Sequence, residues 1–303
     1  MKISVIVPTY KPKGYLWECL DSLVAQTLPG SEWELLLVLN GCCEPWHTQI
    51  EQYISSKMQG INVVFVQTDS PGVSNARNIA LDRACGEYIT FIDDDDYVSP
   101  QYLEELLKKA SKNTISLCYP LSFIDGSNSY TPYYITKQYL ENAGNEVYGF
   151  MKARKYFNGP VYKLLSRDII GDRRFNVNFK NGEDSLFMFQ ISDRFKYVVF
   201  TSKSATYYRR IRQGSATTGV RSISQIIWNG MKWNMELSKI FLTSPFSYNL
   251  MFYITGILGS VHSTIDSLRQ RNRNVGIISD STISKMGGVE RSQFNCSTVA
   301  MAA

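Results

Sequence analysis

The sequence predicts an α/β protein built on a doubly wound, mostly parallel β-sheet. Two observations lead to this fold class. Short apolar runs, typical of buried strands, alternate with segments of helical spacing over the first hundred residues, and polar residues directly follow each run. The composition agrees, because 44% hydrophobic and 19% charged residues are usual for a folded protein. A chain of 303 residues suffices for one large domain or two modest ones.

The strands of the first half are expected where β-branched or continuous apolar runs occur, at residues 3–7, 34–39, 61–66 and 88–92. Helices are expected between them, at residues 15–28, 44–58 and 73–84. Strands and helices that alternate at this spacing form right-handed crossovers, which place successive strands parallel to one another.

After residue 111 the regular alternation ends. Short strands are expected at residues 116–124, 130–135, 161–166, 197–201 and 205–208, and helices at 145–156 and 184–194. Two further helices are expected at residues 222–242 and 247–269, with a break at Ser244 and Pro245. The last thirty residues lack periodicity, so a tail or an arm is expected there, at residues 271–303.

Charge and cysteine usage argue against several classes of protein. The net charge of +5 suits a polyanionic ligand, such as a nucleotide diphosphate, or an anionic membrane surface. No long Lys/Arg run is present, so no nucleic-acid partner is expected. Six cysteines without a CxxC pair, and only two histidines, argue against a zinc site and a disulfide framework. With no secretory signal and no apolar stretch long enough to span a bilayer, we expect a cytoplasmic protein.

Four consecutive carboxylates, Asp93 to Asp96, follow the strand expected at residues 88–92. Adjacent anions repel one another and are costly to bury, so the stability of the fold does not explain them. At the tip of a strand they offer oxygen ligands to a hard divalent cation. The alternative is a solvated acidic turn in which Asp96 or Ser99 caps the next helix.

Polar residues also follow the other expected strands, and the carboxyl ends of parallel strands are where such sheets bind ligands. These residues are Pro8-Thr9-Tyr10, Asn40-Gly41, and the loop at residues 69–72 that leads to Arg77. The sequence contains neither GxGxxG after the first strand nor GxxxxGK[ST]. A phosphate would therefore have to be held by a metal ion and by Arg or Lys side chains.

Five segments, in this order and spacing, resemble the inverting glycosyltransferases of family 2, of the bacterial polysaccharide type. They are VIVPTY at 5–10, GVSNARNIAL at 72–81, FIDDDDY at 91–97, GED at 182–184 and RIRQGS at 210–215. The resemblance covers residues 3–217 and implies the GT-A fold. It makes residues 1–110 the nucleotide-sugar-binding half, residues 111–220 the acceptor-binding half and residues 221–270 a C-terminal helical extension.

The resemblance also implies a role for each matched residue. Asp184 would be the catalytic base, with Glu183 beside it toward the acceptor. Asp95, with Asp93, would hold Mn²⁺ or Mg²⁺ in the DxD motif, and Asp93 or Asp94 would face the ribose and the sugar. The other matched positions would line the nucleoside pocket, border the base and sugar or close over the diphosphate: Pro8, Thr9, Tyr10, Asn40, Arg77, Arg210, Arg212 and Ser215.

The chain departs from the family pattern after the second strand, where two aspartates are often found and Leu39 and Asn40 stand here. An Asn carbonyl can still accept from a uracil N–H, so uridine remains the expected base. The resemblance thus implies a UDP-sugar donor, a saccharide or lipid-linked acceptor, and transfer of a hexose in surface polysaccharide assembly. A single base without an enzyme nucleophile gives inversion at the anomeric carbon.

Other interpretations remain open from the residues alone. Asp184 is also the kind of carboxylate that a helix N-terminus favours, and the three arginines at 209–212 suit a solvated strand end. An aspartyl phosphohydrolase would also end a strand in DxD, but it normally has Thr or Val where Tyr97 stands. A non-catalytic nucleotide-sugar-binding subunit would keep the pocket without turnover.

The expected helices at 222–269 carry many apolar residues. They are expected to pack on the catalytic domain or on a second subunit, as in a homodimer. The alternative is an interfacial surface lying peripherally on the inner membrane leaflet, near a lipid-linked acceptor.

Overall fold

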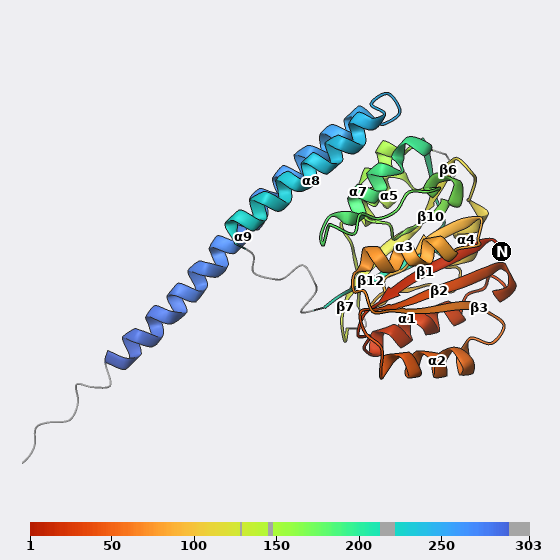
Figure 1. Ribbon diagram of the computed structural model, residues 1–303, viewed down its shortest axis with the longest axis horizontal. Helices are drawn as coiled ribbons and strands as arrows, with labels where there is room; N and C mark the ends of the chain where they lie inside the picture. Colours follow the sequence, from red (N-terminus) through yellow and green to blue (C-terminus); the bar gives the residue numbers. More distant parts are fainter. Residues whose placement is uncertain (128, 145–147, 213–221, 291–303) are drawn as a thin grey trace, which may run out of the picture.

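A computed structural model describes residues 1–127, 129–144, 148–212 and 222–290, with side chains up to residue 271 (Figure 1). It contains an eight-stranded sheet, a smaller four-stranded sheet and a pair of long C-terminal helices beside them. The predicted α/β fold with a mostly parallel sheet and a helical C-terminal part is confirmed.

The first half of the large sheet consists of four parallel strands. These are β1 (Ile3–Thr9), β2 (Trp33–Asn40), β3 (Asn62–Thr68) and β4 (Tyr88–Phe91). They lie parallel in the order β3-β2-β1-β4. Every residue of β1 and β2 is buried, which explains why both are nearly continuous apolar runs.

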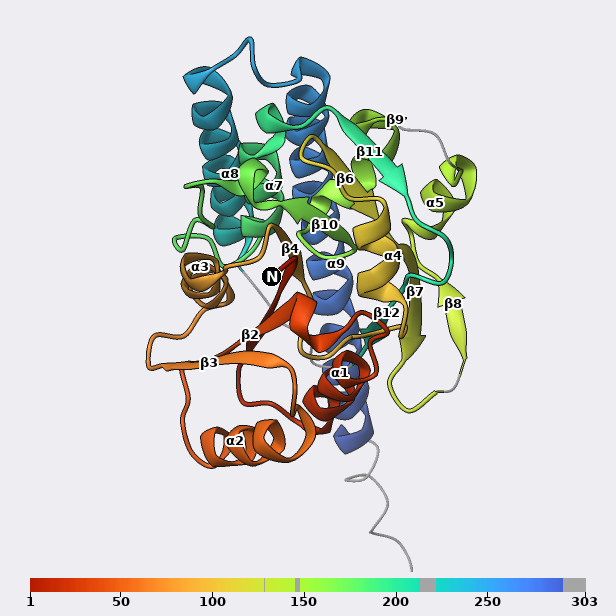
Figure 2. The same cartoon turned by 90° about the vertical axis from the view of Figure 1, so that its right-hand side faces the viewer.

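The crossover helices lie on both faces of these strands. They are α1 (Gly14–Val24), α2 (Trp46–Lys57) and α3 (Val73–Arg83). Figures 1 and 2 show α2 on one side of β3 and α3 on the other. Because the chain moves outward from β1 to β3 and then returns to β4, the direction of strand addition reverses between β1 and β4. Ligands of doubly wound sheets bind at such a reversal, beyond the carboxyl ends of the strands.

The second half extends the large sheet and builds the small one. The large sheet continues from β4 through β10 (Lys163–Ser166), β6 (Thr114–Leu117), β11 (Tyr197–Phe200) and β9 (Tyr148–Gly149), with β10 antiparallel to both of its neighbours. The small sheet has the order β5-β12-β7-β8, from β5 (Tyr97–Val98), β12 (Thr206–Ile211), β7 (Tyr119–Ile124) and β8 (Tyr130–Pro132). The single strand expected at 116–124 is therefore two strands in different sheets. They separate at Cys118, whose N–H donates to the carbonyl of Tyr162.

Shorter helical segments cover the rest of the second half. They are α4 (Tyr102–Lys108), α5 (Thr136–Asn142), α6 (Arg167–Ile170), α7 (Glu183–Gln190), and the 3₁₀ segments η1 (Gly30–Glu32), η2 (Phe150–Asn158) and η3 (Ser192–Arg194). The helix cap at Asp96 or Ser99, considered as the alternative to a metal site, does not form, because α4 begins later and its N-cap, Gln101, makes no side-chain capping bond.

The C-terminal helices are α8 (Ile223–Thr243) and α9 (Leu250–Glu290). A capping box between Ser222 and Gln225 begins α8, and the break falls at the expected Ser-Pro pair. Part of the segment expected as a tail is the continuation of α9. No helix within the described part of the chain is long and apolar enough to cross a membrane.

One side of this helical pair packs on the domain that contains the two sheets, where α8 lies against α7 (Figure 2). Trp233 of α8 donates from Nε1 to the carbonyl of Gly182, and the ring of Phe252 in α9 contacts Phe150 and Phe189. The pair also exposes apolar side chains, among them Trp228, Met231, Met235, Met251, Leu258 and Ile265.

Candidate active site

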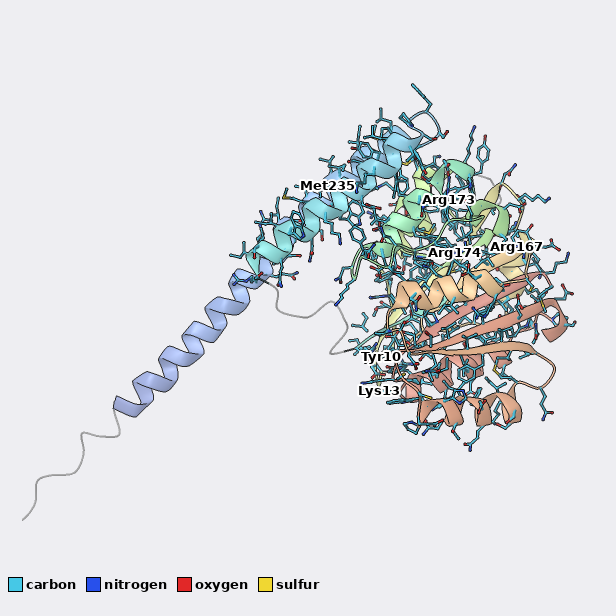
Figure 3. The ribbon with its side chains drawn as sticks, in the orientation of Figure 1. Tyr10, Lys13, Arg167, Arg173, Arg174 and Met235 are labelled. Carbon is cyan, nitrogen blue, oxygen red and sulfur yellow. The ribbon has the colours of Figure 1, made fainter. Side chains whose placement is uncertain are left out.

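The predicted site residues gather where β1, β2 and β4 end. Pro8 and Thr9 are the buried last residues of β1. Tyr10 follows them and is 49% exposed, at the edge of the domain that faces the C-terminal helices (Figure 3). Ser215 lies outside the described residues.

Asn40 ties the ends of two strands to the loop before α3. Its Nδ2 donates to the carbonyl of Thr9 over 2.7 Å, and its Oδ1 accepts from the N–H of Gly72 over 2.9 Å. The side chain is buried, so both bonds serve the backbone of the loops. A carbonyl oxygen has two lone pairs, and only one is left for a ligand.

Each of the four consecutive aspartates accepts hydrogen bonds from different residues. Asp93 Oδ1 accepts from Arg77, and Asp94 Oδ2 accepts from the Thr9 hydroxyl over 2.5 Å. Asp95 Oδ2 accepts from Nε of Arg212 over 2.6 Å. Asp96 turns inward, and its contacts are described below. The repulsion between the four adjacent carboxyl groups is thus offset by separate donors, among them Arg77, the Thr9 hydroxyl and Arg212.

Burial acts on the carboxyl groups at this edge. It raises the pKa of Asp94 to about 7, and the nearby Asp95 and Asp93 act in the same direction while the Thr9 hydroxyl opposes them. Burial likewise raises the pKa of Asp93, against the guanidinium of Arg77, with Asp95 and Asp184 adding to the rise.

Arg77 joins the DxD motif to the predicted base. This residue of α3 is 3% exposed, and one of its terminal nitrogens donates to Asp184 Oδ1 over 2.6 Å while the other donates to Asp93 Oδ1 over 2.9 Å. Its guanidinium also lies 5.3 Å from the ring centroid of Phe175. A planar fork with both arms bonded fixes the relative position of the two carboxylates.

Asp184 lies in the first turn of α7, and one of its two carboxylate oxygens does not bond to Arg77. Oδ1 is bound to Arg77, whereas Oδ2 faces the turn at Gly159, where an added Cβ would lie 3.8 Å away. The side chain is 31% exposed. Gly182 precedes α7 with a φ of +80°, and a Cβ there would come within 2.7 Å of Trp233, so a glycine is required at this turn.

Glu183, expected beside the base toward the acceptor, is 7% exposed, and its Oε2 has no hydrogen-bond partner among the described residues. Burial raises its pKa, with the charge of Asp184 adding to the rise. Its burial means that contact with an acceptor would require the surrounding side chains to open.

Arg210 and Arg212 have unequal environments. Arg210 is buried, and it donates to Glu18, to Asp125 and to the carbonyl of Asp95. Arg212 is more exposed, binds the Asp95 carboxylate and lies 5.0 Å from the ring centroid of Tyr15. Of the two, Arg212 has more donor capacity left for a phosphate.

The sequence alone did not indicate which buried residues support the loops at the carboxyl ends of the strands. Asp96 accepts from the hydroxyl of Tyr207 and from the N–H of Arg210, and burial raises its pKa well above the ordinary value. Lys163, which the sequence leaves without a role, donates to the carbonyls of Tyr156, Gly159 and Val161 over 2.5 to 2.8 Å. Only the DDDD run itself gave a local signal, because the partners come from distant segments.

The donor set suits a hard divalent cation. The described residues contain no group of three or more His, Cys, Asp or Glu side chains arranged to enclose an ion. One or two carboxylates that complete their shell with substrate phosphates are the usual arrangement for Mg²⁺, and Asp95 and Asp93 provide them. The side chains of both are accessible, at 20% and 40% exposure, and one oxygen of each is outside the bonds to arginine.

A doubly wound sheet with an acidic run and an arginine-held carboxylate at its reversal point agrees with the GT-A glycosyltransferase class that the sequence predicts. The comparisons agree with this class. The profile of glycosyl transferase family 2 matches residues 4–173. The chain belongs to this family, which favours a protein of the glycosyltransferase class over an aspartyl phosphohydrolase.

The relatives include glycosyltransferases of several bacteria. The chain is 27% identical over 217 residues to the poly(ribitol-phosphate) β-N-acetylglucosaminyltransferase TarS of Staphylococcus aureus, over 71% of this chain and 36% of TarS. It is 24% identical over 239 residues to a GalNAc(5)-diNAcBac-PP-undecaprenol β-1,3-glucosyltransferase of Campylobacter jejuni, over 79% and 74%. It thus spans about a third of the length of TarS.

The structural comparison gives the same result. The crystal structure of S. aureus TarS residues 1–349 in complex with UDP-GlcNAc is similar with a TM-score of 0.60 and 25% identity. The similarity covers 78% of this chain and 66% of that one.

Proposed function

We propose that this chain is a metal-dependent, inverting glycosyltransferase that moves a hexose from a UDP-sugar to a hydroxyl group of a saccharide or lipid-linked acceptor in surface polysaccharide assembly. The observation that carries the proposal is the fork of Arg77, which bonds the DxD carboxylate of Asp93 and the carboxylate of Asp184 at once. The donor motif and the candidate base are thus held together at the strand-order reversal.

The donor is proposed to enter at the ends of β1 and β2. Thr9, Asn40 and the exposed ring of Tyr10 would form the nucleoside side, and Arg212 would face the diphosphate. UDP is supported by the similarity to TarS, which was crystallised with UDP-GlcNAc. The free lone pair of Asn40 Oδ1 is the group available to the uracil N–H.

Asp95 and Asp93 would hold Mn²⁺ or Mg²⁺. When bound, this ion supplies Lewis-acid stabilisation of the departing diphosphate. The free oxygen of each carboxylate is the proposed ligand, and the arginine bonds fix the rotamers of both side chains.

Asp184 Oδ2 is the proposed proton acceptor. As the acceptor hydroxyl forms its bond to the anomeric carbon, its proton passes to Oδ2, and the bond between that carbon and the diphosphate oxygen breaks. The leaving electron pair stays on the UDP oxygen. Attack from the face opposite to UDP inverts the configuration. Arg77 keeps Oδ1 occupied, so only Oδ2 is presented to the acceptor.

The test is a thermal-shift and hydrolysis experiment with UDP-hexoses, with Mn²⁺ or with EDTA. We expect a rise in melting temperature and release of UDP that both disappear with EDTA and in Asp95→Asn. The exposed Asp172, which pairs with Arg194, gives a matched control, and Asp172→Asn should behave as the wild type. Full UDP release in Asp95→Asn, or in EDTA, would contradict the proposal.

A second experiment concerns the base. Asp184→Asn should still bind the UDP-sugar but transfer about 10²- to 10⁴-fold more slowly, the usual contribution of a general base. Unchanged transfer by Asp184→Asn would exclude this role. Location in the cytoplasm, peripheral membrane contact through residues 222–269 and formation of a homodimer stay predictions.

A further inference from the structure

A groove of about 450 Å³ lies between the catalytic domain and the C-terminal helices, at the start of α7, the helix that carries Asp184. On the domain side it is lined by Gly182, two residues before Asp184, and by Asn158, the neighbour of Gly159. Trp233 of α8 closes against Gly182 from the helical side. The groove therefore passes the turn that carries the proposed base, because Gly182 and Ser185, on either side of Asp184 in the sequence, line it.

The groove is longer than one sugar unit. Its wall on α9 extends from Phe252 to Ser267, which corresponds to about 22 Å along a helix at 1.5 Å per residue. This wall is made mostly of small and hydroxyl-bearing residues: Thr255, Gly256, Gly259, Ser260, Ser263, Thr264 and Ser267. The remaining lining includes large apolar side chains: Phe157, Phe189, Ile226, Trp233, Leu237 and Phe252. A groove of this length with both kinds of lining suits an extended chain that has polar groups and apolar faces.

The glycines along the groove differ in what they pack against. A Cβ on Gly256 would come within 3.0 Å of Leu237, and one on Gly230 within 2.5 Å of Thr264, so both serve helix contacts. A Cβ on Gly259 would meet nothing within 4 Å. Packing of the helices therefore does not account for the glycine at position 259, which faces open space in the groove.

Arg154 of η2 brings a positive charge to the same groove. Its guanidinium makes one long hydrogen bond, 3.4 Å to the carbonyl of Thr255, and it has no carboxylate partner within the described part of the chain. By contrast, Arg77, Arg210 and Arg212 all have carboxylate partners. An arginine without an internal anion in a partly enclosed groove is suited to an anion of the ligand.

We infer that this groove binds an extended acceptor that carries a phosphate group some distance from its reacting hydroxyl, with Arg154 contacting the phosphate. The inference rests on the proposed function, because it places the reacting hydroxyl at Asp184. The phosphate can belong to a lipid diphosphate that bears the saccharide or to a polyol-phosphate chain. Both present the same anion to the guanidinium.

The experiment is calorimetry of three acceptors on the full chain loaded with UDP. One probe is N-acetylglucosamine linked through a diphosphate to a short prenyl chain, the second is a ribitol-phosphate oligomer, and the third is the neutral octyl N-acetylglucosaminide. We expect at least one phosphate probe to bind about tenfold to a hundredfold more tightly than the neutral one, as a charge-assisted bond gives. The phosphate probe that binds more tightly than the neutral one identifies the source of the phosphate.

Arg154→Gln should reduce this ratio of dissociation constants to within about threefold, and Arg154→Lys should keep part of it. The neighbouring Lys155 is exposed and does not line the groove, so Lys155→Gln is the matched control and should keep the full ratio. Gly259→Phe should weaken both extended probes without lowering the melting temperature, because the helix interior favours residues other than glycine.

Equal affinity of the three probes for the wild type, or a ratio unchanged in Arg154→Gln, would overturn the inference. The inference would also be overturned if the prenyl-diphosphate probe and the ribitol-phosphate oligomer bound Gly259→Phe as tightly as the wild type. Release of UDP from UDP-sugar by the wild type without any acceptor tests the proposed function separately. Its absence would count against the donor chemistry whatever the acceptor probes show.

Discussion

Replacing Arg77 tests whether one buried guanidinium holds the two halves of the site together. Arg77→Met keeps an unbranched apolar side chain beside Phe175 but removes both bonds, to Asp184 Oδ1 and to Asp93 Oδ1. Hydrogen bonds to charged groups contribute about 1.5–3 kcal/mol each. Because the two carboxylates are 31% and 40% exposed, water can replace part of each bond.

We therefore expect Arg77→Met to lower the free energy of unfolding by about 3 kcal/mol, toward the lower end of the summed bond energies. Arg77→Lys should lose less, because an ammonium keeps the charge but cannot form the planar fork that reaches both carboxylates. The assay is urea unfolding followed by tryptophan fluorescence, in EDTA so that added metal does not bind the carboxylates.

A double-mutant cycle with Asp184→Asn isolates the bond between Arg77 and Asp184. If this bond contributes as proposed, the loss caused by Arg77→Met should be smaller by about 1.5 kcal/mol in the Asp184→Asn background. The transfer rate of Arg77→Met should also fall about a hundredfold, since a base displaced by 1 Å can cost that much. An unfolding free energy within 0.5 kcal/mol of the wild type, or equal losses in both backgrounds, would refute the reasoning.

Three further changes give definite expectations. Asn40→Asp places a carboxylate oxygen against the carbonyl of Thr9, where Nδ2 now donates, so urea unfolding should show a loss of about 1–3 kcal/mol and calorimetry no gain in UDP affinity. Glu183 has a raised pKa because it is buried, so its proton stabilises the fold at low pH and this stability is lost as the pH rises through the folded-state pKa. The melting temperature of Glu183→Gln relative to the wild type should therefore rise between pH 4 and pH 8, and a difference independent of pH would contradict this. Lys163→Met leaves three carbonyls without their donor and should cost at least about 3 kcal/mol by the same unfolding assay, whereas exposed Lys155→Met should cost almost nothing.

The first half of the fold could be predicted because its signals are local. Buried parallel strands such as β2 are continuous apolar runs, and Pro-Gly or Asn-Gly pairs end the intervening segments. The second half could not be predicted to the same detail. Nothing near Cys118 indicates that β6 and β7 belong to different sheets, because that depends on Tyr162, far along the chain.

The same distinction applies to the site. The residues at or just beyond strand ends, such as Thr9 and Asp93, could be found from position alone. The contacts that set their behaviour could not, because Arg210 meets Glu18 and Asp125 from segments far apart in sequence. Sequence patterns place a residue at the ligand edge, but burial and counter-charges follow only from the three-dimensional arrangement.

The balance of charge at this edge gives a physical reason for the proposed metal dependence. The carboxyl groups that meet there outnumber the guanidinium groups of Arg77, Arg210 and Arg212; they are Glu18, Asp93, Asp94, Asp95, Asp96, Asp125 and Asp184. Burial favours the protonated forms of Asp93, Asp94 and Asp96, and even with all three protonated the four remaining carboxylates exceed the three arginines. An approaching diphosphate would meet net repulsion, which a divalent cation at Asp95 and Asp93 would reverse. Affinity for UDP should therefore depend on the cation more steeply than affinity for uridine, which has no phosphate. Calorimetry of both ligands with and without Mn²⁺ measures this difference, and an equal dependence would show that the carboxylates do not oppose the phosphates.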